Sequence, residues 1–139
     1  MGAKAALTAG WIAAALLVLL AGCSTTPEAL ETKSDAASQN YSDNYQEVYQ
    51  PLAGTAGRCI TGPGTPVLSM AVEATLHKEL GFGEVRFVAI GLVYSNYFVL
   101  AKIEKMGPGS RVSVKANNPI ISEKLSKMVF RWAGGDQEC

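Results

Sequence analysis

Residues 85–93 have the sequence Val-Arg-Phe-Val-Ala-Ile-Gly-Leu-Val, and no other stretch of the chain constrains its fold as strongly. In an extended strand, successive side chains point to opposite faces, so a strand with one solvated face alternates between apolar and polar residues. This stretch is instead apolar on both faces. One face carries Val85, Phe87 and Ala89, and the other carries Val88, Ile90 and Leu92. We therefore predict a central strand of a sheet that needs cover on both faces.

Three further strands are predicted around this one. Residues 70–77 and 112–116 alternate between apolar and polar side chains, whereas residues 97–105 are apolar on both faces over much of their length. The turns between the strands are short, and they are Gly81-Phe82-Gly83, Tyr94-Ser95-Asn96 and Gly107-Pro108-Gly109. Because short turns between consecutive strands are typical of antiparallel pairing, we predict a four-stranded antiparallel meander.

One helix is predicted before the meander and one after it. Apolar side chains recur every three or four residues over 45–59, after a helix start at Ser42-Asp43-Asn44. Pro51 is expected to kink this helix or to end it early. The second helix is predicted between a capping Asn118 and a stop at Gly134. The fold class is thus α+β, in the order helix, four-stranded antiparallel meander, helix.

The composition is that of one folded domain without a charge bias. The chain has 139 residues, of which 48% are apolar and 17% are charged, and this balance argues against a disordered protein. The 12 basic residues equal the 12 acidic residues. Since binding to the phosphates of nucleic acids requires a strong basic excess, we expect no nucleic acid partner.

The first 23 residues have the features of an export signal. Lys4 precedes an apolar run over residues 11–20, which is too short to span a bilayer comfortably as a helix. The run ends in Leu20-Ala21-Gly22-Cys23, which resembles the lipobox of bacterial lipoproteins at all four positions. The resemblance implies a type II signal peptide cleaved before Cys23, a diacylglyceryl group on the Cys23 sulfur, and an acyl chain such as palmitate on the new amino terminus. The alternative is an ordinary signal peptide with a coincidental cysteine.

Ser24 bears on the destination of the protein. In lipoproteins of this class, a non-acidic residue after the lipidated cysteine usually implies sorting to the outer membrane. The resemblance therefore implies an outer-membrane protein, anchored by lipid, whose domain lies in the periplasm. The inner membrane and the cell surface are the other locations left open.

Residues 24–41 are rich in Ser, Thr, Ala and acidic residues and show no sustained apolar period. Such a segment buries too little apolar surface to offset its ordering entropy, so we predict a flexible tether. The predicted organisation is a signal peptide over residues 1–22, the lipidated cysteine with its tether over 23–41, and a single domain over 42–139.

Cys59 and Cys139 remain once Cys23 is assigned to lipid. In a domain exported to the oxidising periplasm, two cysteines most simply form one disulfide, which would tie the last residue to the end of the first helix. Two free thiols are the alternative. A metal site is not expected, since two cysteines and a single histidine make no recognisable zinc pattern.

The arrangement of helix, cysteine, sheet and terminal helix carries a second resemblance. Together with the tail Trp-Ala-Gly-Gly-Asp-Gln-Glu-Cys over residues 132–139, it is similar to a group of small uncharacterised proteobacterial lipoproteins. This resemblance implies no activity and no site residues.

His77 is the only histidine, and it is the one residue around which a catalytic relay can be imagined. It shares the polar face of its strand with Glu73 and Ser69, but such side chains are about 7 Å apart, too far for a nucleophile to contact its base. The chain also lacks the signatures of nucleophile elbows, phosphate-binding loops and zinc proteases. We therefore expect no enzyme, no catalytic residue and no cofactor.

Basic residues gather between residues 102 and 131, where seven of them accompany only two acidic residues. A basic surface there would bind lipid phosphates, lipopolysaccharide or an acidic protein, and the alternative is an ordinary solvated surface. The seven residues are Lys102, Lys105, Arg111, Lys115, Lys124, Lys127 and Arg131.

A second candidate surface is the apolar sheet face that the two helices would leave open. It consists of Val88, Ile90, Leu92, Phe98 and Leu100. Because such a patch is rarely left in water, either the two helices cover opposite faces of the sheet, or a partner, a second copy or an acyl ligand covers one face.

These observations predict a membrane-anchored, non-catalytic lipoprotein whose domain binds another component of the cell envelope or a second copy of itself. The alternative is a periplasmic carrier or sensor of a small apolar or anionic ligand, held in a groove between sheet and helices. A hydrolase built around His77 is a third reading.

Overall fold

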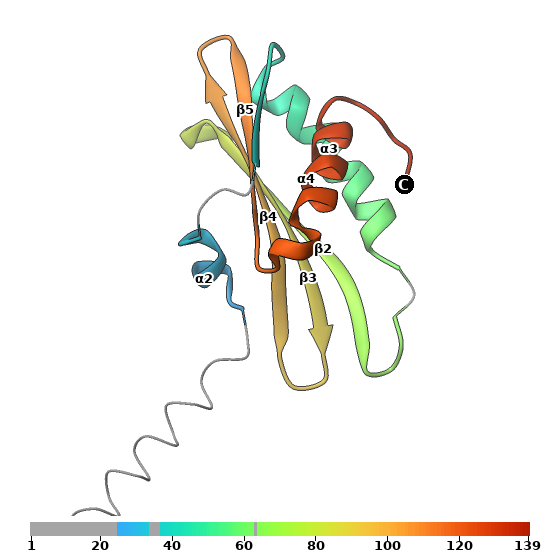
Figure 1. Cartoon of the computed structure of the whole chain (residues 1–139). Helices are drawn as coiled ribbons and strands as arrows, with labels where there is room; N and C mark the ends of the chain where they lie inside the picture. Colours follow the sequence, from blue (N-terminus) through green and yellow to red (C-terminus); the bar gives the residue numbers. More distant parts are fainter. Residues whose placement is uncertain (1–24, 34–36, 63) are drawn as a thin grey trace, which may run out of the picture.

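The computed structural model describes residues 25–33, 37–62 and 64–139, which form a sheet with helices on both faces (Figure 1). The sheet has five antiparallel strands in the order β1-β5-β4-β3-β2. The elements in chain order are α2 (Pro27–Glu31), β1 (Ala37–Tyr41), α3 (Tyr45–Ile60), β2 (Leu68–His77), the 3₁₀ helix η1 (Lys78–Leu80), β3 (Phe82–Gly91), β4 (Ser95–Met106), β5 (Gly109–Ala116) and α4 (Pro119–Ala133).

Helices α3 and α4 pack on one face of the sheet and enclose the core. Leu52 on α3 and Trp132 on α4 are both fully buried, and the ring of Trp132 lies 6.4 Å from that of Phe87 on β3. The buried core consists of Tyr45, Val48, Leu52, Ala56, Val85, Phe87, Val99, Ala101, Ile103, Val112, Val114, Val129, Trp132 and Ala133.

Helix α2 lies on the opposite face, against β4 and β5 (Figure 1). Its first turn is capped by Thr26, whose Oγ1 accepts a hydrogen bond of 3.1 Å from the amide of Ala29. The single buried side chain of α2 is Leu30. Leu30 is thus the apolar side chain through which α2 packs on the sheet.

The α+β class is confirmed, but the predicted four-stranded meander between two helices is wrong. A fifth strand and a third helix, β1 and α2, come from the segment 24–41 that we expected to be a flexible tether. Strand β1 has no apolar alternation, yet it pairs in register with β5, from Ala37 opposite Val114 to Tyr41 opposite Ser110. Hydrogen bonds to a free sheet edge therefore order a segment whose own side chains bury little surface.

Helix α3 runs through Pro51 without ending, from Tyr45 to Ile60, so the expectation of an early end is wrong. Its start is fixed by a capping box. The side chain of Asn44 accepts a hydrogen bond from the backbone at Glu47, and the side chain of Glu47 accepts one from the backbone amide of Asn44. The buried stripe on both sides of Pro51 outweighs the one backbone hydrogen bond that proline removes.

The predicted disulfide is confirmed, since Cys59 and Cys139 are joined with their Cα atoms 5.3 Å apart. The tail after α4 is folded back to make this possible. The indole nitrogen of Trp132 donates a hydrogen bond of 2.8 Å to the carbonyl of Glu138, and Arg131 Nε lies 2.9 Å from Asp136 Oδ2. The last residues are therefore held against the end of α4 as well as by the covalent bond.

The predicted signal peptide, the lipobox at Leu20-Ala21-Gly22-Cys23 and Ser24 lie outside the described residues. Within the part of the chain that is described, no helix has both the length and the apolar character needed to cross a bilayer.

Candidate functional site

Two residues of the predicted interaction face, Val88 and Leu100, are buried on the side of the sheet that α2 covers. They are 1% and 2% exposed, and Leu30 on α2 is fully buried. The chain itself therefore covers the centre of this face. The cover comes from a helix in the predicted tether, and not from either of the two helices that the sequence pattern indicated.

The other residues of the predicted face lie elsewhere. The register between β3 and β4 shifts by one residue beside Phe98, which is left without a partner in the ladder. This bulge turns the Phe98 side chain toward the helices, where its ring lies 6.0 Å from that of Phe87. Ile90 and Leu92 are exposed at one end of the sheet. The five predicted residues consequently do not form one continuous surface.

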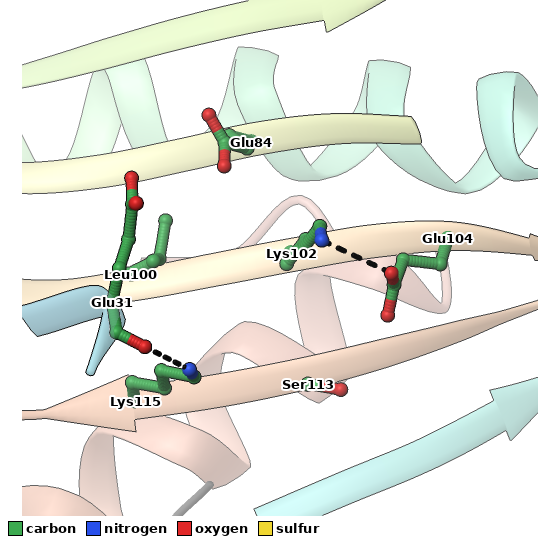
Figure 2. A pocket seen from close by; sticks show the side chains of 7 residues that line it. All are labelled: Glu31, Glu84, Leu100, Lys102, Glu104, Ser113 and Lys115. Atoms are coloured by element: carbon green, nitrogen blue, oxygen red, sulfur yellow. Dashed lines mark hydrogen bonds and ion pairs between the residues drawn. The ribbon is translucent and has the colours of Figure 1, made fainter. Parts of the chain in front are cut away.

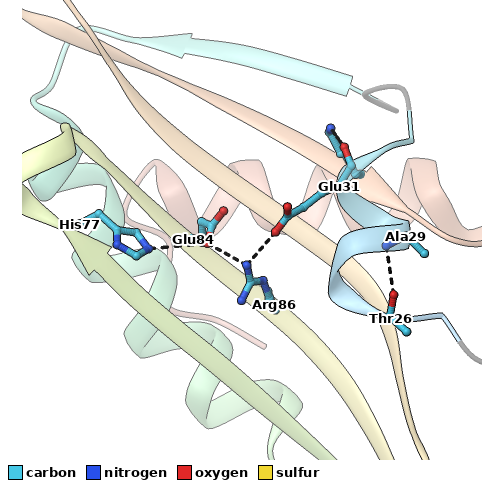
Figure 3. Close-up of polar contacts among 7 residues, drawn as sticks. Thr26, Ala29, Glu31, His77, Glu84 and Arg86 are labelled. Carbon is cyan, nitrogen blue, oxygen red and sulfur yellow. Dashed lines mark hydrogen bonds and ion pairs between the residues drawn. The ribbon is translucent and has the colours of Figure 1, made fainter.

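An ionic network holds α2 against the sheet (Figure 3). Arg86 on β3 places Nη2 2.9 Å from a carboxylate oxygen of Glu31 and 2.9 Å from one of Glu84. Lys115 on β5 donates a hydrogen bond to the backbone carbonyl of Glu31. The carboxyl end of α2 is therefore fixed from two strands, by its last side chain and by its last carbonyl.

A hollow of about 340 Å³ lies beside this network (Figure 2). Charges of both signs surround it, and Lys102 Nζ forms an ion pair of 3.1 Å with Glu104. The described residues include no group of three or more potential metal ligands. The lining residues are Glu31, Glu84, Leu100, Lys102, Glu104, Ser113 and Lys115. Because most of these charges already have partners within the chain, the hollow offers few unpaired groups to a ligand.

His77 is not brought together with the partners of the imagined relay. Its Nε2 lies 3.8 Å from Glu84, and its ring lies 4.5 Å from that of Phe82. Glu73 instead accepts a hydrogen bond of 2.9 Å from the Tyr97 hydroxyl, which raises the pKa of Tyr97. Ser69 lies near the other end of β2. The three side chains therefore do not form a Ser-His-Glu arrangement.

The predicted basic surface is divided between the two faces of the molecule. Lys102 and Lys115 lie on the α2 side of the sheet, while Lys124, Lys127 and Arg131 lie on α4. Several of the seven also have partners: besides the pairs already described, Lys127 lies 2.6 Å from Glu123, and Arg111 donates to Asn40 at 3.0 Å. Lys105 lies on β4, close to the turn before β5. No single face therefore presents the seven cations together.

A further exposed apolar surface, which includes Ile90 and Leu92 of the predicted face, lies at one end of the sheet, where the turn between β3 and β4 meets the start of β2. The exposed apolar side chains there are Val67, Leu68, Ile90, Leu92, Val93 and Tyr94, and we call this set the apolar tip. Leu68 pairs with Gly91, and residues from both segments line one shallow hollow. The signal was present in the sequence, since residues 59–72 and 87–101 contain no Lys, Arg, Asp, Glu or His.

The described chain begins beside this tip. The amide of Thr25 donates a hydrogen bond of 3.1 Å to the Asn96 side chain, and the amide of Tyr97 donates one of 3.0 Å to the Thr25 carbonyl. The side chain of Asn117 donates to both Thr25 Oγ1 and the carbonyl of Tyr97. Thr25 is therefore bound to β4 only two to three residues beyond Tyr94.

No protein-family model matches this chain, and a search of curated proteins found no match to it. A functional proposal therefore rests on the sequence itself and on the geometry of the described residues.

Proposed function

We propose that the protein is a lipid-anchored, non-catalytic module of the bacterial cell envelope. It is attached through acyl chains on Cys23, in the outer membrane with its domain in the periplasm, and its α+β domain binds another envelope component. The attachment rests on the lipobox-like sequence Leu20-Ala21-Gly22-Cys23, and the choice of membrane rests on Ser24.

The observation that carries this proposal is the position of Thr25. It follows Cys23 by two residues and is hydrogen bonded to the side chain of Asn96 and the backbone of Tyr97. Two residues span at most about 7 Å of extended chain. Acyl chains on Cys23 would therefore hold one end of the sheet directly at the membrane, instead of holding a domain on a long tether.

What supports a protein partner is the free edge of β2. This strand is ten residues long and lies at the edge of the sheet. In the described chain, its central part is paired with β3 alone. Glu73 is the only charged residue within it apart from the terminal His77. An edge strand with few charges and no proline presents unpaired amides and carbonyls to an extended segment of another protein.

The ligand-binding alternative is supported by the hollow beside α2, whose volume of about 340 Å³ is that of a small-molecule pocket. Lys102 and Lys115 would attract an anion, but Glu31, Glu84 and Glu104 line the same hollow. The carboxylates therefore weaken the attraction, and we place the envelope-binding function first.

Attachment is tested by mass spectrometry of the amino-terminal peptide of the full chain, expressed with a carboxyl-terminal tag in a Gram-negative host. The expected peptide begins at Cys23 and carries three acyl chains. Cys23→Ser should abolish both the acylation and the cleavage before residue 23. A mature protein that begins elsewhere, or a Cys23 without lipid, would refute the proposal.

Partner binding is tested by placing a photocrosslinking side chain at Thr75, which is exposed on β2, with Lys127 on α4 as the matched exposed control. The expected result is one defined crosslinked species from position 75 that is absent from position 127. Equal or absent crosslinking at both positions would argue against the β2 edge as the site.

A further inference from the structure

The apolar tip exposes large apolar side chains at the turn between β3 and β4. Val93, Leu92 and Tyr94 are 90%, 75% and 61% exposed, and they are consecutive in the turn between β3 and β4. Leu68, the first residue of β2, and Val67 just before it add two further exposed apolar side chains. Exposed apolar side chains gathered in this way, without charged neighbours in either segment, mark a contact surface.

The tip lies at one end of the molecule. Figure 1 shows the β3–β4 turn and the start of β2 together at the lower end of the view, and the β4–β5 turn at the opposite end. Strand β4, whose twelve residues connect the two turns, is about 40 Å long at the usual rise per residue. The tip and the β4–β5 turn therefore form two well-separated ends of the same sheet.

The proposed lipid site lies at the same end as the tip. Thr25 is bound to Asn96 and Tyr97, which follow Tyr94 by two and three residues, and Cys23 precedes Thr25 by two. Cys23 and Thr25 are thus separated by at most about 7 Å of extended chain, so a lipid on Cys23 would enter the membrane close to this end of the sheet. No long connection allows the domain to turn the tip away.

We infer that the apolar tip inserts into the surface of the lipid bilayer, beside the acyl chains on Cys23, and that the domain therefore stands on the membrane in one orientation. This inference rests on the proposed lipid attachment and names the bilayer itself as the partner of the tip. Continuity between the tip and the anchor favours lipid over a second protein as the occupant.

The position of the nearest charges on the strands agrees with a shallow insertion. Moving away from the tip, the first charged residue on each strand is Glu73 on β2, five residues beyond Leu68, Arg86 on β3, four residues before Ile90, and Lys102 on β4, eight residues beyond Tyr94. At the usual rise of a strand these residues lie about 16 Å, about 13 Å and about 26 Å along the chain. Surface-bound segments typically enter the bilayer by about 5–10 Å, so all three charges would remain in water.

Tyr94 adds a group suited to the boundary between lipid and water. Its ring is apolar and its hydroxyl is polar, and tyrosine is enriched at the interface of membranes for this reason. In the inserted orientation, Leu92 and Val93 enter the acyl region while the hydroxyl of Tyr94 stays at the level of the headgroups.

The test uses tryptophan as a reporter in the acylated mature protein, which begins at Cys23 and therefore lacks Trp11. Val93→Trp is compared with Met106→Trp, because Met106 is the exposed last residue of β4, at the end of the strand away from the tip. Each protein is reconstituted in vesicles of phosphatidylethanolamine and phosphatidylglycerol, with and without brominated acyl chains. The native Trp132 is fully buried and supplies the same background in both.

The expected result is that brominated lipid lowers the emission of Trp at position 93 at least twofold and leaves that at position 106 unchanged. Leu92→Asp, combined with Val93→Trp, should restore most of the emission, because a carboxylate opposes entry into the acyl region. Position 92 is exposed, so this change leaves the core intact.

Two outcomes overturn the inference and leave the proposed lipid attachment in place. If the acylated protein shows equal emission at positions 93 and 106 with either lipid, the tip remains in water. If emission at position 93 shifts to the blue without quenching by bromine, the tip is buried against another protein or a second copy. Failure of the lipid attachment itself is distinguished beforehand, because the mass of the amino-terminal peptide would then lack the acyl chains.

Discussion

Arg86 on β3 and Glu31 on α2 form an ion pair of 2.9 Å, although α2 precedes all five strands in the chain and β3 is an inner strand of the sheet. The same guanidinium nitrogen lies 2.9 Å from Glu84. The side chains of Arg86 and Glu84 are only 23% and 13% exposed, so solvent screens this part of the network weakly. Arg86 thus forms ion pairs both within the sheet, with Glu84, and with α2, which packs over the sheet.

Arg86→Ala is expected to lower the free energy of unfolding by about 1–3 kcal/mol, because it removes the arginine partner of the largely buried carboxylate of Glu84. Lys127→Ala is the matched control. It breaks the ion pair between Lys127 and Glu123, whose side chains are 73% and 78% exposed, and should leave the free energy of unfolding almost unchanged because water screens this pair. Urea unfolding followed by circular dichroism measures both changes. Equal losses from the two variants would contradict this account of the network.

Leu30→Ala is expected to destabilise the protein by about 2–3 kcal/mol, since it removes the only buried side chain of α2 and leaves a cavity over the sheet. The exposed Leu80 provides a leucine whose truncation should have almost no effect. Limited proteolysis complements the unfolding measurement, because release of α2 would expose residues 27–33 to cleavage. Unchanged stability and resistance in Leu30→Ala would mean that α2 is not anchored by this side chain.

The double variant Cys59→Ser/Cys139→Ser is expected to lose about 4 kcal/mol of stability, because the disulfide closes a loop with a sequence separation of 80 residues in the unfolded chain. The measurement is urea unfolding of the variant beside the oxidised and the reduced native sequence. Reduction and substitution should have the same effect. A loss below about 1 kcal/mol would show that the hydrogen bonds of the tail suffice without the bond.

Gly109→Ala is expected to cost about 1–3 kcal/mol and to weaken the pairing of β1 with β5. A methyl group there would lie 2.3 Å from the backbone carbonyl oxygen of Tyr41, so the two strands must move apart. Gly54→Ala on α3 is the contrasting change, because its methyl group meets no atom within 4 Å. It should raise stability by about 0.5–1 kcal/mol through the higher helix propensity of alanine. Thermal unfolding of both variants measures these changes, and we expect a lower melting temperature for Gly109→Ala and a higher one for Gly54→Ala.

Tyr41 makes the stability of the protein fall in strong base. Burial raises the pKa of Tyr41 from 10.0 to about 12, and its hydroxyl donates a hydrogen bond of 2.9 Å to the carbonyl of Phe130. Between these two pH values the unfolded state releases the proton while the folded state keeps it, so stability is fully present below pH 10 and is lost as the pH rises toward 12. Tyr41→Phe should reduce this slope, as measured by urea unfolding at several pH values. An unchanged slope above pH 10 would contradict the assignment to Tyr41.

Much of the fold could be predicted because its signals are local. The helical stripe over residues 45–59, the start of α4 after its cap Asn118 and the four strands β2 to β5 follow from side-chain periodicity and capping within a few residues. The side chain of Asn118 indeed accepts a hydrogen bond of 2.9 Å from the amide of Ile120, as a cap should. Strand β1 could not be recognised, because Ala-Ser-Gln-Asn-Tyr has no alternation and becomes a strand only beside the free edge of β5.

The candidate site was less predictable, for reasons that particular residues show. Alternation alone predicts Phe98 on the open face, whereas the bulge in β4 moves it to the other face. The local excess of basic residues predicts Lys115 in a basic surface, whereas it donates a hydrogen bond to the carbonyl that ends α2. In both cases the partner that determines the outcome is distant in the chain, so no pattern around the residue itself indicates it.

The sequence by itself determined that residues 85–93 need cover on both faces, that two cysteines suit one disulfide, and that residues 87–101 carry no charge. These properties depend only on which side chains follow one another. The tertiary structure alone decided that α2 supplies the second cover, that β1 completes the sheet, and that Thr25 lies beside the apolar tip. These depend on which distant segments meet, because a hydrogen bond to a free edge or a buried leucine gains stability only from the surface it finds there.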